Sequence, residues 1–382
     1  MAQPLTGAAM HDAVLFEECR CADGKRLGIA TLNSEKSLNA LTLEMIRLLQ
    51  PQLASWEADP DIAAVLLRGA GEKAFCAGGD VRALRDALLS DDSHPQPQAL
   101  DFFREEYTLD YHIHCYAKPL IVWGHGIVMG GGLGLMAGAS HRVATSATRI
   151  AMPEITIGLY PDVAGSWFLQ RMPARVGLFL GLTGAPLNAH DALICNLADH
   201  VLASDAWPQL LEQLQQQYWD ADAATRNAQV SALLSQLEQA ARSSLPPSNV
   251  LPNLLTIHQL MTQGDLASVA DSLSTQQFDN DWLASAAKNF CHGCPVSAAV
   301  TWEIFQRARH LSLAEALRME LILSLNFCHK PDFREGVRAL LVDKDRQPQW
   351  HYRQLADIPQ DWVDNHFVAP WPADQHPLAS LP

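Results

Sequence analysis

Three consecutive glycines, Gly130, Gly131 and Gly132, precede two carboxylates, Glu154 and Asp162, that lie further along the chain. Glycine lets a ligand approach the backbone closely and leaves N–H groups free to point at it. A helix that begins in such a turn adds partial positive charge at the same place. These residue types could stabilise an oxyanion and supply a proton carrier or a nucleophile. The glycines alone favour a simpler interpretation, a tight strand-to-helix turn beside two solvated acids.

A second glycine-rich turn, residues 76–80, also lies between an expected strand and an expected helix. Gly79 and Gly131 could therefore each offer an N–H group to one oxygen atom. Such a two-donor hole suits a thioester carbonyl that becomes an enolate or a tetrahedral oxyanion, and each donor is typically worth about 3–4 kcal/mol in the transition state. Neither turn matches the P-loop or the dinucleotide-binding pattern.

The surrounding pattern predicts strands that alternate with helices. Thr42 is a good N-cap for an amphipathic helix, with Pro51 as a possible kink or early end. Further helices are expected from residue 81 and over residues 100–116. The predicted strands are residues 13–21, 27–32, 63–67, 120–123 and 142–145. This order indicates an α/β core over residues 1–205, whereas helical patterning dominates residues 206–382.

Composition limits the classes of function. The chain has 382 residues, is 48% hydrophobic and carries a net charge of -15 without a Lys/Arg block, which argues against nucleic acid as a partner. It shows no apolar stretch long enough for a membrane span and no signal peptide, so we expect no membrane partner and a cytoplasmic location. Eight scattered cysteines do not indicate a disulfide framework. Cys291 and Cys294 form a lone C-x-x-C, whose role stays open, and no metal is expected.

Short segments spread along the chain resemble the crotonase (enoyl-CoA hydratase/isomerase) superfamily. The segments that carry this resemblance are Ser37-Leu-Asn-Ala-Leu41, Ala74-Phe-Cys-Ala-Gly-Gly-Asp80, Gly126-Ile-Val-Met-Gly-Gly-Gly132 and Met152-Pro-Glu154. Within the superfamily the chain resembles the 3-hydroxyisobutyryl-CoA hydrolase subgroup. The segments for this second resemblance are residues 76–82, 103–107, 151–154, 157–163 and 333–345. Each segment alone is weak, but together and in order they are specific; the resemblance is thinnest over residues 206–290.

The resemblance implies an α/β fold, a spiral of ββα units with an added C-terminal helical region. The core of residues 1–205 would hold the coenzyme A and acyl site, and the C-terminal helices would pack on it. Coenzyme A would enter as part of the substrate, with no separate cofactor. Family members are often trimers or dimers of trimers, so a homo-oligomer is possible.

The resemblance also assigns roles to individual residues. Glu154 and Asp162 would be catalytic, and Gly79 and Gly131 would form the oxyanion hole. Glu106 would bind substrate, together with Gly131, Glu154 and Asp162. The expected coenzyme A-binding residues are Lys36, Leu41, Ala77, Gly78, Gly79 and Asp80. Simpler alternatives stay open: Asp162 or Asp80 as a helix cap, Glu106 paired with Arg104 or Lys118 on a solvated face, and Lys36 as a surface lysine.

One departure separates the chain from ordinary hydratases. Those enzymes carry two catalytic glutamates, and the position of the first is Gly134 here. Adding water across a double bond needs an acid/base pair, so we expect thioester hydrolysis, with 3-hydroxyisobutyryl-CoA and valine breakdown as the favoured substrate and pathway. The alternatives are an enoyl-CoA hydratase or isomerase that uses Glu154 alone, and a non-catalytic acyl-CoA-binding or RNA-binding protein.

Overall fold

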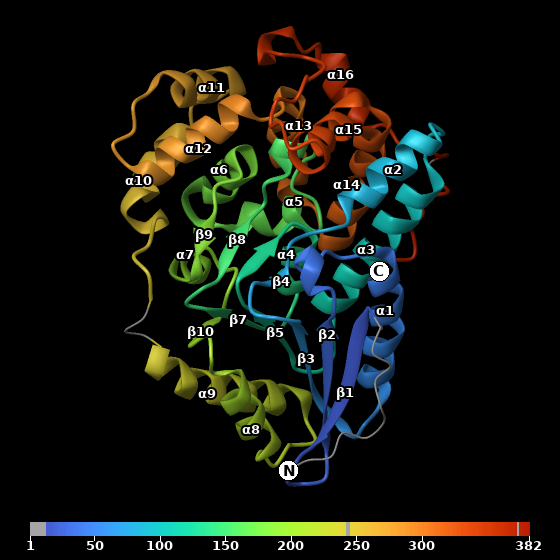
Figure 1. Ribbon diagram of the computed structural model, residues 1–382, viewed down its shortest axis with the longest axis vertical. Helices are drawn as coiled ribbons and strands as arrows, with labels where there is room; N and C mark the ends of the chain where they lie inside the picture. Colours follow the sequence, from blue (N-terminus) through green and yellow to red (C-terminus); the bar gives the residue numbers. More distant parts are fainter. Residues whose placement is uncertain (1–12, 242–244, 373) are drawn as a thin grey trace. The chain divides into compact units, whose positions relative to one another are not determined.

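The computed structural model describes residues 13–241, 245–372 and 374–382 (Figure 1). These residues divide into two compact units, each made of three separate stretches of chain. The first unit consists of the described residues of Met1–Gly79, Leu109–Ile150 and Leu187–Ser248. The second consists of the described residues of Asp80–Thr108, Ala151–Pro186 and Asn249–Pro382.

A six-stranded sheet forms the centre of the first unit. Its strands are β1 (Val14–Arg20), β2 (Arg26–Leu32), β3 (Ile62–Gly69), β5 (Leu120–Gly124), β7 (His141–Thr145) and β10 (His200–Leu202), in the order β1-β2-β3-β5-β7-β10. β1 and β2 are an antiparallel hairpin, and the other neighbours are parallel. The five predicted strands are therefore confirmed. β5 is buried along its whole length, as expected for an apolar strand in the middle of a parallel sheet.

A second sheet of very short strands was not predicted. It contains β4 (Ala74–Cys76), β6 (Ile127–Met129), β8 (Arg149–Ala151) and β9 (Leu187–Asn188), in that order. Along the chain β3 is followed by β4, β5 by β6 and β7 by β8, and a helical segment follows each pair. Each turn of the chain thus gives one strand to either sheet, which is the ββα spiral that the resemblance implied.

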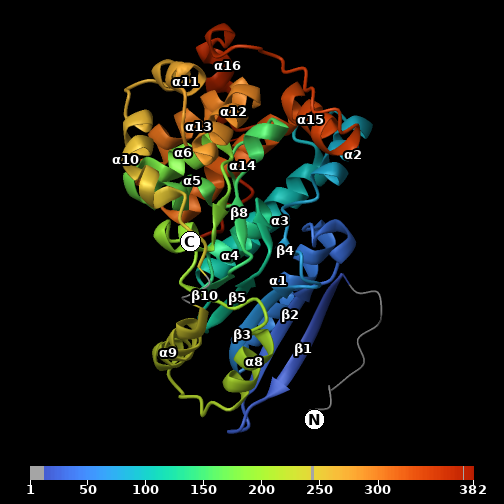
Figure 2. The same ribbon diagram turned by 60° about the vertical axis from the view of Figure 1, so that its left-hand side comes forward.

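Helices cover the large sheet within the first unit. α1 (Leu43–Ala58) begins at the predicted cap, where the Thr42 side chain accepts the Met45 N–H, and it continues through Pro51. α8 (Trp207–Gln215) and α9 (Ala223–Ala241) contribute to one apolar core with β2, β3, β5 and β7 (Figures 1 and 2). Among the described residues beyond 206 the chain forms helices and no strand. The division into domains at residue 205 stays a prediction.

The second unit is mostly helical. α3 (Pro97–His114) begins in it and ends in the first unit, and α14 (Leu313–His329) is buried along most of its length. Its other α-helices are α2 (Val81–Ser90), α5 (Gly165–Phe168), α6 (Val176–Thr183), α10 (Val250–Met261), α11 (Leu266–Thr275), α12 (Asp281–His292), α13 (Pro295–Arg307), α15 (Pro331–Val337) and α16 (Gln360–Asp364). None of the helices in the described ranges is long and apolar enough to cross a membrane.

Candidate active site

The two glycine-rich turns follow neighbouring strands of the short sheet in the first unit. β4 and β6 are parallel, with Cys76 opposite Val128, so both turns leave the sheet at the same end. A side-chain carbon placed on Gly78 would lie 3.4 Å from the Met129 carbonyl oxygen, which puts the two turns side by side. Gly78 has a φ of 107° and Gly130 a φ of 47°, which residues with side chains rarely adopt. The sequence therefore needs glycine at these two points.

Both predicted oxyanion donors have free amides. Gly131 is the first residue of α4 (Gly131–Ala137), where a backbone N–H has no partner inside its own helix. Gly79 forms a β-bridge with Leu41, but the Leu41 N–H donates to the carbonyl oxygen of the neighbouring Gly78, at 2.8 Å. Within the described part of the chain, neither the Gly79 nor the Gly131 N–H donates to another atom. That both amides point at one oxygen atom stays a prediction.

Gly132 allows the start of α4 to pack against the end of β4. A side-chain carbon on Gly132 would lie 2.4 Å from the Cys76 carbonyl oxygen. We expect Gly132→Ala to lower the free energy of unfolding by about 1–3 kcal/mol, the usual cost of overpacking. Alanine has the higher helix propensity, so a lower melting temperature would report the clash rather than the helix. Thermal unfolding checks this, and an unchanged melting temperature would contradict the close packing.

The residues predicted to bind coenzyme A lie around the first of these turns. Within the first unit, Ala77 donates its N–H to the Leu38 oxygen at 3.1 Å, Leu41 is buried, and Lys36 is exposed. In the second unit, Asp80 caps α2 by accepting the Ala83 N–H at 3.1 Å, which confirms the capping interpretation. Contact of these residues with coenzyme A stays a prediction.

Asn39 is a residue of this region that the sequence analysis did not single out. Its side chain is fully buried and donates to the carbonyl oxygens of Ala70 and Ala74, at 3.0 and 2.9 Å. It thereby fixes the loop before Leu41 to the start of β4. The signal that could have found it is the Leu-Asn-Ala segment, which was used only as part of the resemblance.

The predicted acids gather in the second unit. Glu106, Glu154 and Asp162 are 2%, 5% and 5% exposed, so none is a solvated surface acid. Because Glu106 is buried, the predicted alternative of a pair with Arg104 or Lys118 on a solvated face is wrong. Arg104 bonds Asp101 at 2.8 Å and Glu105 at 3.3 Å. Burying a carboxylate costs free energy unless the group is paired and hydrogen-bonded. Buried acids with a shifted pKa are typical of active sites.

Glu154 is held by a short, rigid segment. It begins the 3-10 helix Glu154–Ile157, which Gly158 ends with a φ of 69°. The Gly158 backbone packs so closely on Asp332 that an added side-chain carbon would lie 2.4 Å from the Asp332 oxygen. Glu154 Oε2 is buried and has no hydrogen-bond partner among the described residues. Burial, and then repulsion from Asp162, raise the pKa of Glu154 well above its ordinary value.

Asp162 occupies a different environment. Burial raises its pKa to about 6, and a hydrogen bond from the Tyr107 hydroxyl to Oδ2, at 2.8 Å, opposes that rise. Asp162 is followed by Val163 and Ala164, whose φ values of 52° and 68° are strained for residues with side chains. Its own backbone oxygen accepts the Gly165 N–H at 2.7 Å. The Asp162 carboxyl therefore lies at a tight turn and is not a regular helix cap.

Glu320 on α14 holds that turn. Its Oε2 accepts the Ala164 N–H at 2.8 Å, and its Oε1 accepts the N–H and the hydroxyl of Ser166 at 2.9 and 2.5 Å. Burial raises the pKa of Glu320 to about 8, while the bonds from Ser166 and Ala164 favour the charged form. Tyr107 and Tyr160 lie inside segments that carried the resemblance but were not singled out. Glu320 could have been found as the one charged residue in the apolar stretch 319–328 of α14.

Other candidate sites lack such support. Cys291 is exposed and Cys294 is buried, and both are free thiols. Burial raises the pKa of Cys294 to about 12, which makes it an inert thiol. Among the residues that the structure describes, no group of three His, Cys, Asp or Glu side chains is placed to hold a metal ion.

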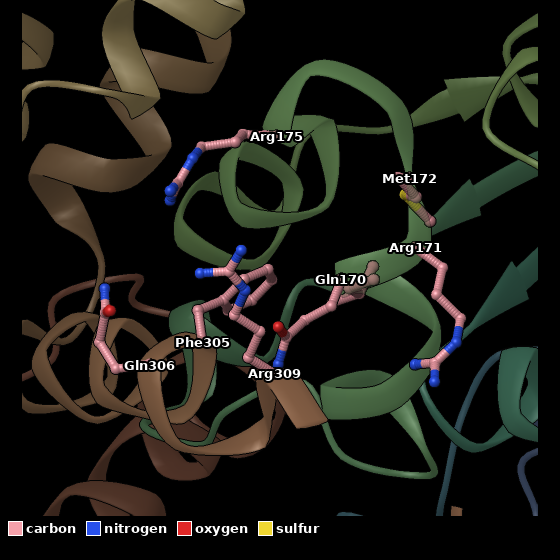
Figure 3. A pocket seen from close by; sticks show the side chains of 8 residues that line it. Gln170, Arg171, Met172, Arg175, Phe305, Gln306 and Arg309 are labelled. Carbon is pink, nitrogen blue, oxygen red and sulfur yellow. The ribbon is translucent and has the colours of Figure 1, made fainter. Parts of the chain in front are cut away.

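A cavity in the second unit lies apart from the predicted residues, none of which lines it. Figure 3 shows the Arg175 and Arg309 side chains reaching into the same space, while Arg171 turns away and stacks on Trp167 at 3.7 Å. The lining residues are Leu169, Gln170, Arg171, Met172, Arg175, Phe305, Gln306 and Arg309.

Comparison with known proteins identifies the class. Residues 27–367 match a family model described as enoyl-CoA hydratase/isomerase. The chain belongs to the enoyl-CoA hydratase/isomerase family, and the resemblance read from its motifs is confirmed. It is 38% identical over 354 residues to 3-hydroxyisobutyryl-CoA hydrolase, mitochondrial, of Danio rerio, which covers 93% of this chain and 89% of that one. It is 35% identical over 357 residues to the protein of the same name of Homo sapiens, with 93% and 88% covered.

Solved structures share the fold. A carnitinyl-CoA dehydratase from Mycobacterium thermoresistibile is 33% identical, with a TM-score of 0.82 over 96% of this chain and 98% of that one. An enoyl-CoA hydratase from Rhodobacter sphaeroides 2.4.1 is 31% identical, with a TM-score of 0.78 over 94% and 97%. The predicted fold class is therefore confirmed.

Proposed function

We propose that this protein hydrolyses 3-hydroxyisobutyryl-CoA to 3-hydroxyisobutyrate and coenzyme A, as a step of valine breakdown. The observation that carries the proposal is its identity of 35–38% to proteins of that name over most of both chains. The burial of the three acids, and the Glu154 oxygen that has no hydrogen-bond partner among the described residues, support a catalytic rather than a structural role for this part of the chain.

In the proposed reaction, the Gly79 and Gly131 amides stabilise the charge that develops on the thioester oxygen. Glu154 attacks the carbonyl carbon to form a mixed anhydride, which water then hydrolyses to regenerate Glu154, or it activates water for direct attack on the carbonyl. In both routes the coenzyme A thiolate leaves and takes up a proton that water gives up. Asp162 orients the water or the substrate 3-hydroxyl, and Glu106 contributes to acyl binding. Lys36, Leu41, Ala77, Gly78 and Asp80 are the proposed contacts of coenzyme A. The reaction as written draws on no separate cofactor.

A second candidate is an enoyl-CoA hydratase or isomerase. The names of the two solved structures favour it, since one is a dehydratase and the other a hydratase. Gly134 stands against it, because that residue cannot supply the second acid of a hydratase. The net charge of -15 also argues against an RNA-binding role.

The assay that separates these candidates follows free thiol and the enoyl chromophore in parallel. We expect thiol release from 3-hydroxyisobutyryl-CoA to be faster than hydration of crotonyl-CoA by the same preparation. Acetyl-CoA and 3-hydroxypropionyl-CoA complete the panel and report how far the acyl group matters. Robust hydration of crotonyl-CoA without thiol release would overturn the hydrolase proposal in favour of the second candidate.

Location and assembly belong to the proposal as well. We propose a cytoplasmic protein that forms a homo-oligomer, a trimer or a dimer of trimers. The names of the curated relatives include the word mitochondrial, so cell fractionation is the direct test of location. Light scattering of the purified protein tests the oligomer.

A further inference from the structure

Three buried hydroxyls connect Asp162 to the backbone of α14. The Tyr107 oxygen lies 2.8 Å from Asp162 Oδ2 and 2.7 Å from the Ser324 oxygen. The Ser324 oxygen lies 2.9 Å from the Tyr160 oxygen, which in turn lies 2.6 Å from the Glu320 carbonyl oxygen. Tyr107, Tyr160 and Ser324 are all 0% exposed. These four contacts form a chain with a carboxyl at one end and a backbone carbonyl at the other.

The number of hydrogen atoms that can fill these contacts depends on the protonation state of Asp162. Three hydroxyls bring three hydrogens to four contacts, so one contact lacks a hydrogen when Asp162 is ionised. Tyr107 then donates to Asp162, Tyr160 donates to the Glu320 carbonyl, and Ser324 donates to one of the two tyrosines. A proton on Asp162 brings the fourth hydrogen. All donors then point the same way, from Asp162 through Tyr107, Ser324 and Tyr160 to the carbonyl.

We infer that Tyr107, Ser324 and Tyr160 are positioning residues that hold the Asp162 carboxyl in place in both of its protonation states, by rotation of their hydroxyls. The inference rests on the proposed function only in giving Asp162 a proton to gain and lose during turnover. The three hydroxyls only rotate, and no covalent bond to carbon is made or broken among them. The proton stays on Asp162 or leaves it for water or substrate.

The titratable groups around Asp162 explain why the Tyr107 hydroxyl matters for the pKa of this carboxyl. The titratable groups that interact with Asp162 are Tyr107 on α3, Glu154 on its 3-10 helix, Tyr160 on the same loop, and Glu320 and Cys328 on α14. Each of these is an acid, so none of them favours the carboxylate by opposite charge. The Tyr107 hydrogen bond is the larger of two interactions that lower the pKa of Asp162 against burial, and the other is a hydrogen bond from the backbone N–H of Asp162 itself.

Two matched variants test the inference, Tyr107→Phe and Tyr160→Phe. Both remove one hydroxyl from a fully buried ring, but only the first removes the donor to Asp162. The Asp162 carboxyl should be titrated directly in the unliganded protein, by carbon-detected NMR with labelled aspartate and with Asp162→Asn to assign the signal. We expect Tyr107→Phe to raise the pKa of Asp162 by about one to two units, the worth of one hydrogen bond to a charged group. Tyr160→Phe should give no rise, since Tyr107 and Ser324 still serve the ionised form.

The pH profile of thiol release is the second readout. Its acid limb should move to higher pH in Tyr107→Phe and stay in place in Tyr160→Phe, with circular dichroism showing that both variants fold. Equal shifts in the two variants, or no shift in either, would overturn the inference. If Tyr107→Phe does not fold, Ser324→Ala replaces it: an Asp162 pKa that falls supports the chain, and one that is unchanged or rises overturns it. A wild-type protein without thioesterase activity would refute the proposed function, yet the NMR titration would still decide this inference.

Discussion

Glu154→Gln is expected to lower kcat for thiol release by roughly 10²–10⁴-fold, with a modest change in KM. Glutamine keeps the size of the side chain but cannot attack a carbonyl or accept a proton. The affected group is buried, and one of its oxygens has no donor among the described residues, so the fold does not need its charge. Stopped or continuous thiol assays across substrate concentrations separate the two constants.

Two controls make this result specific. Glu44→Gln makes the same change on an exposed residue of α1 and should leave turnover unchanged. The melting temperature supplies the second control. The folded-state pKa of Glu154 is raised, so the contribution of this group to wild-type stability is largest at acid pH and falls as pH rises above its ordinary value of 4.5. Glu154→Gln should therefore gain stability relative to wild type as pH rises. Near wild-type turnover in this variant would remove Glu154 from the mechanism.

Asp162→Asn is expected to lower turnover by about 10²-fold and to change substrate preference more than Glu154→Gln does. Asparagine can still accept the Tyr107 hydrogen bond, so the turn should keep its shape. If Asp162 binds the 3-hydroxyl, the wild-type preference for 3-hydroxyisobutyryl-CoA over isobutyryl-CoA should shrink in the variant. The ratio of the two kcat/KM values measures this, and an unchanged ratio would exclude Asp162 from recognition of the hydroxyl.

The pH dependence of activity should also differ between the wild type and Asp162→Asn, in a direction that the pKa of Asp162 sets. Asp162 has a pKa of about 6, so wild-type activity that needs the carboxylate should fall as pH drops through that value. Asp162→Asn should lack this acid limb and keep its low activity across the range. A limb near pH 6 that persists in Asp162→Asn belongs to another group.

The sequence predicted five of the six strands of the large sheet, all but β10, and most helices, because their apolar residues repeat over several positions. β3 and α1 are long enough to show such a period, with eight and 16 residues. β9 has two residues and β4 three, which is too short for any periodicity, so the second sheet was missed. Pro51 lies inside α1 rather than at its end. Packing of a helix against a sheet can override a local preference of this kind, and no sequence window contains that information.

The sequence analysis found the site residues that stand in short motifs, and it missed the residues that contact them from distant parts of the chain. The glycine turns, Glu154 and Asp162 each stand in a short, readable segment. Glu320 is separated from Ala164 by 156 positions, and Ser324 from Tyr107 by 217. A single sequence carries no signal for such pairs except that α14 has polar residues on a buried face. Residues such as Glu320 and Ser324, which hold the turn around Asp162, are therefore harder to predict from the sequence than the turn itself.

That separation also sets an order of events during synthesis. Translation at about 5–20 residues per second adds Glu320 roughly 8–30 s after Ala164, the residue whose amide it holds. Until then the strained turn at Val163 and Ala164 has no carboxylate to fix it, and Tyr107 and Tyr160 have no Ser324 between them. A nascent chain that already contains both acids therefore lacks the contacts that place Asp162. Enzymatic competence should be a late event, acquired after α14 has left the ribosome.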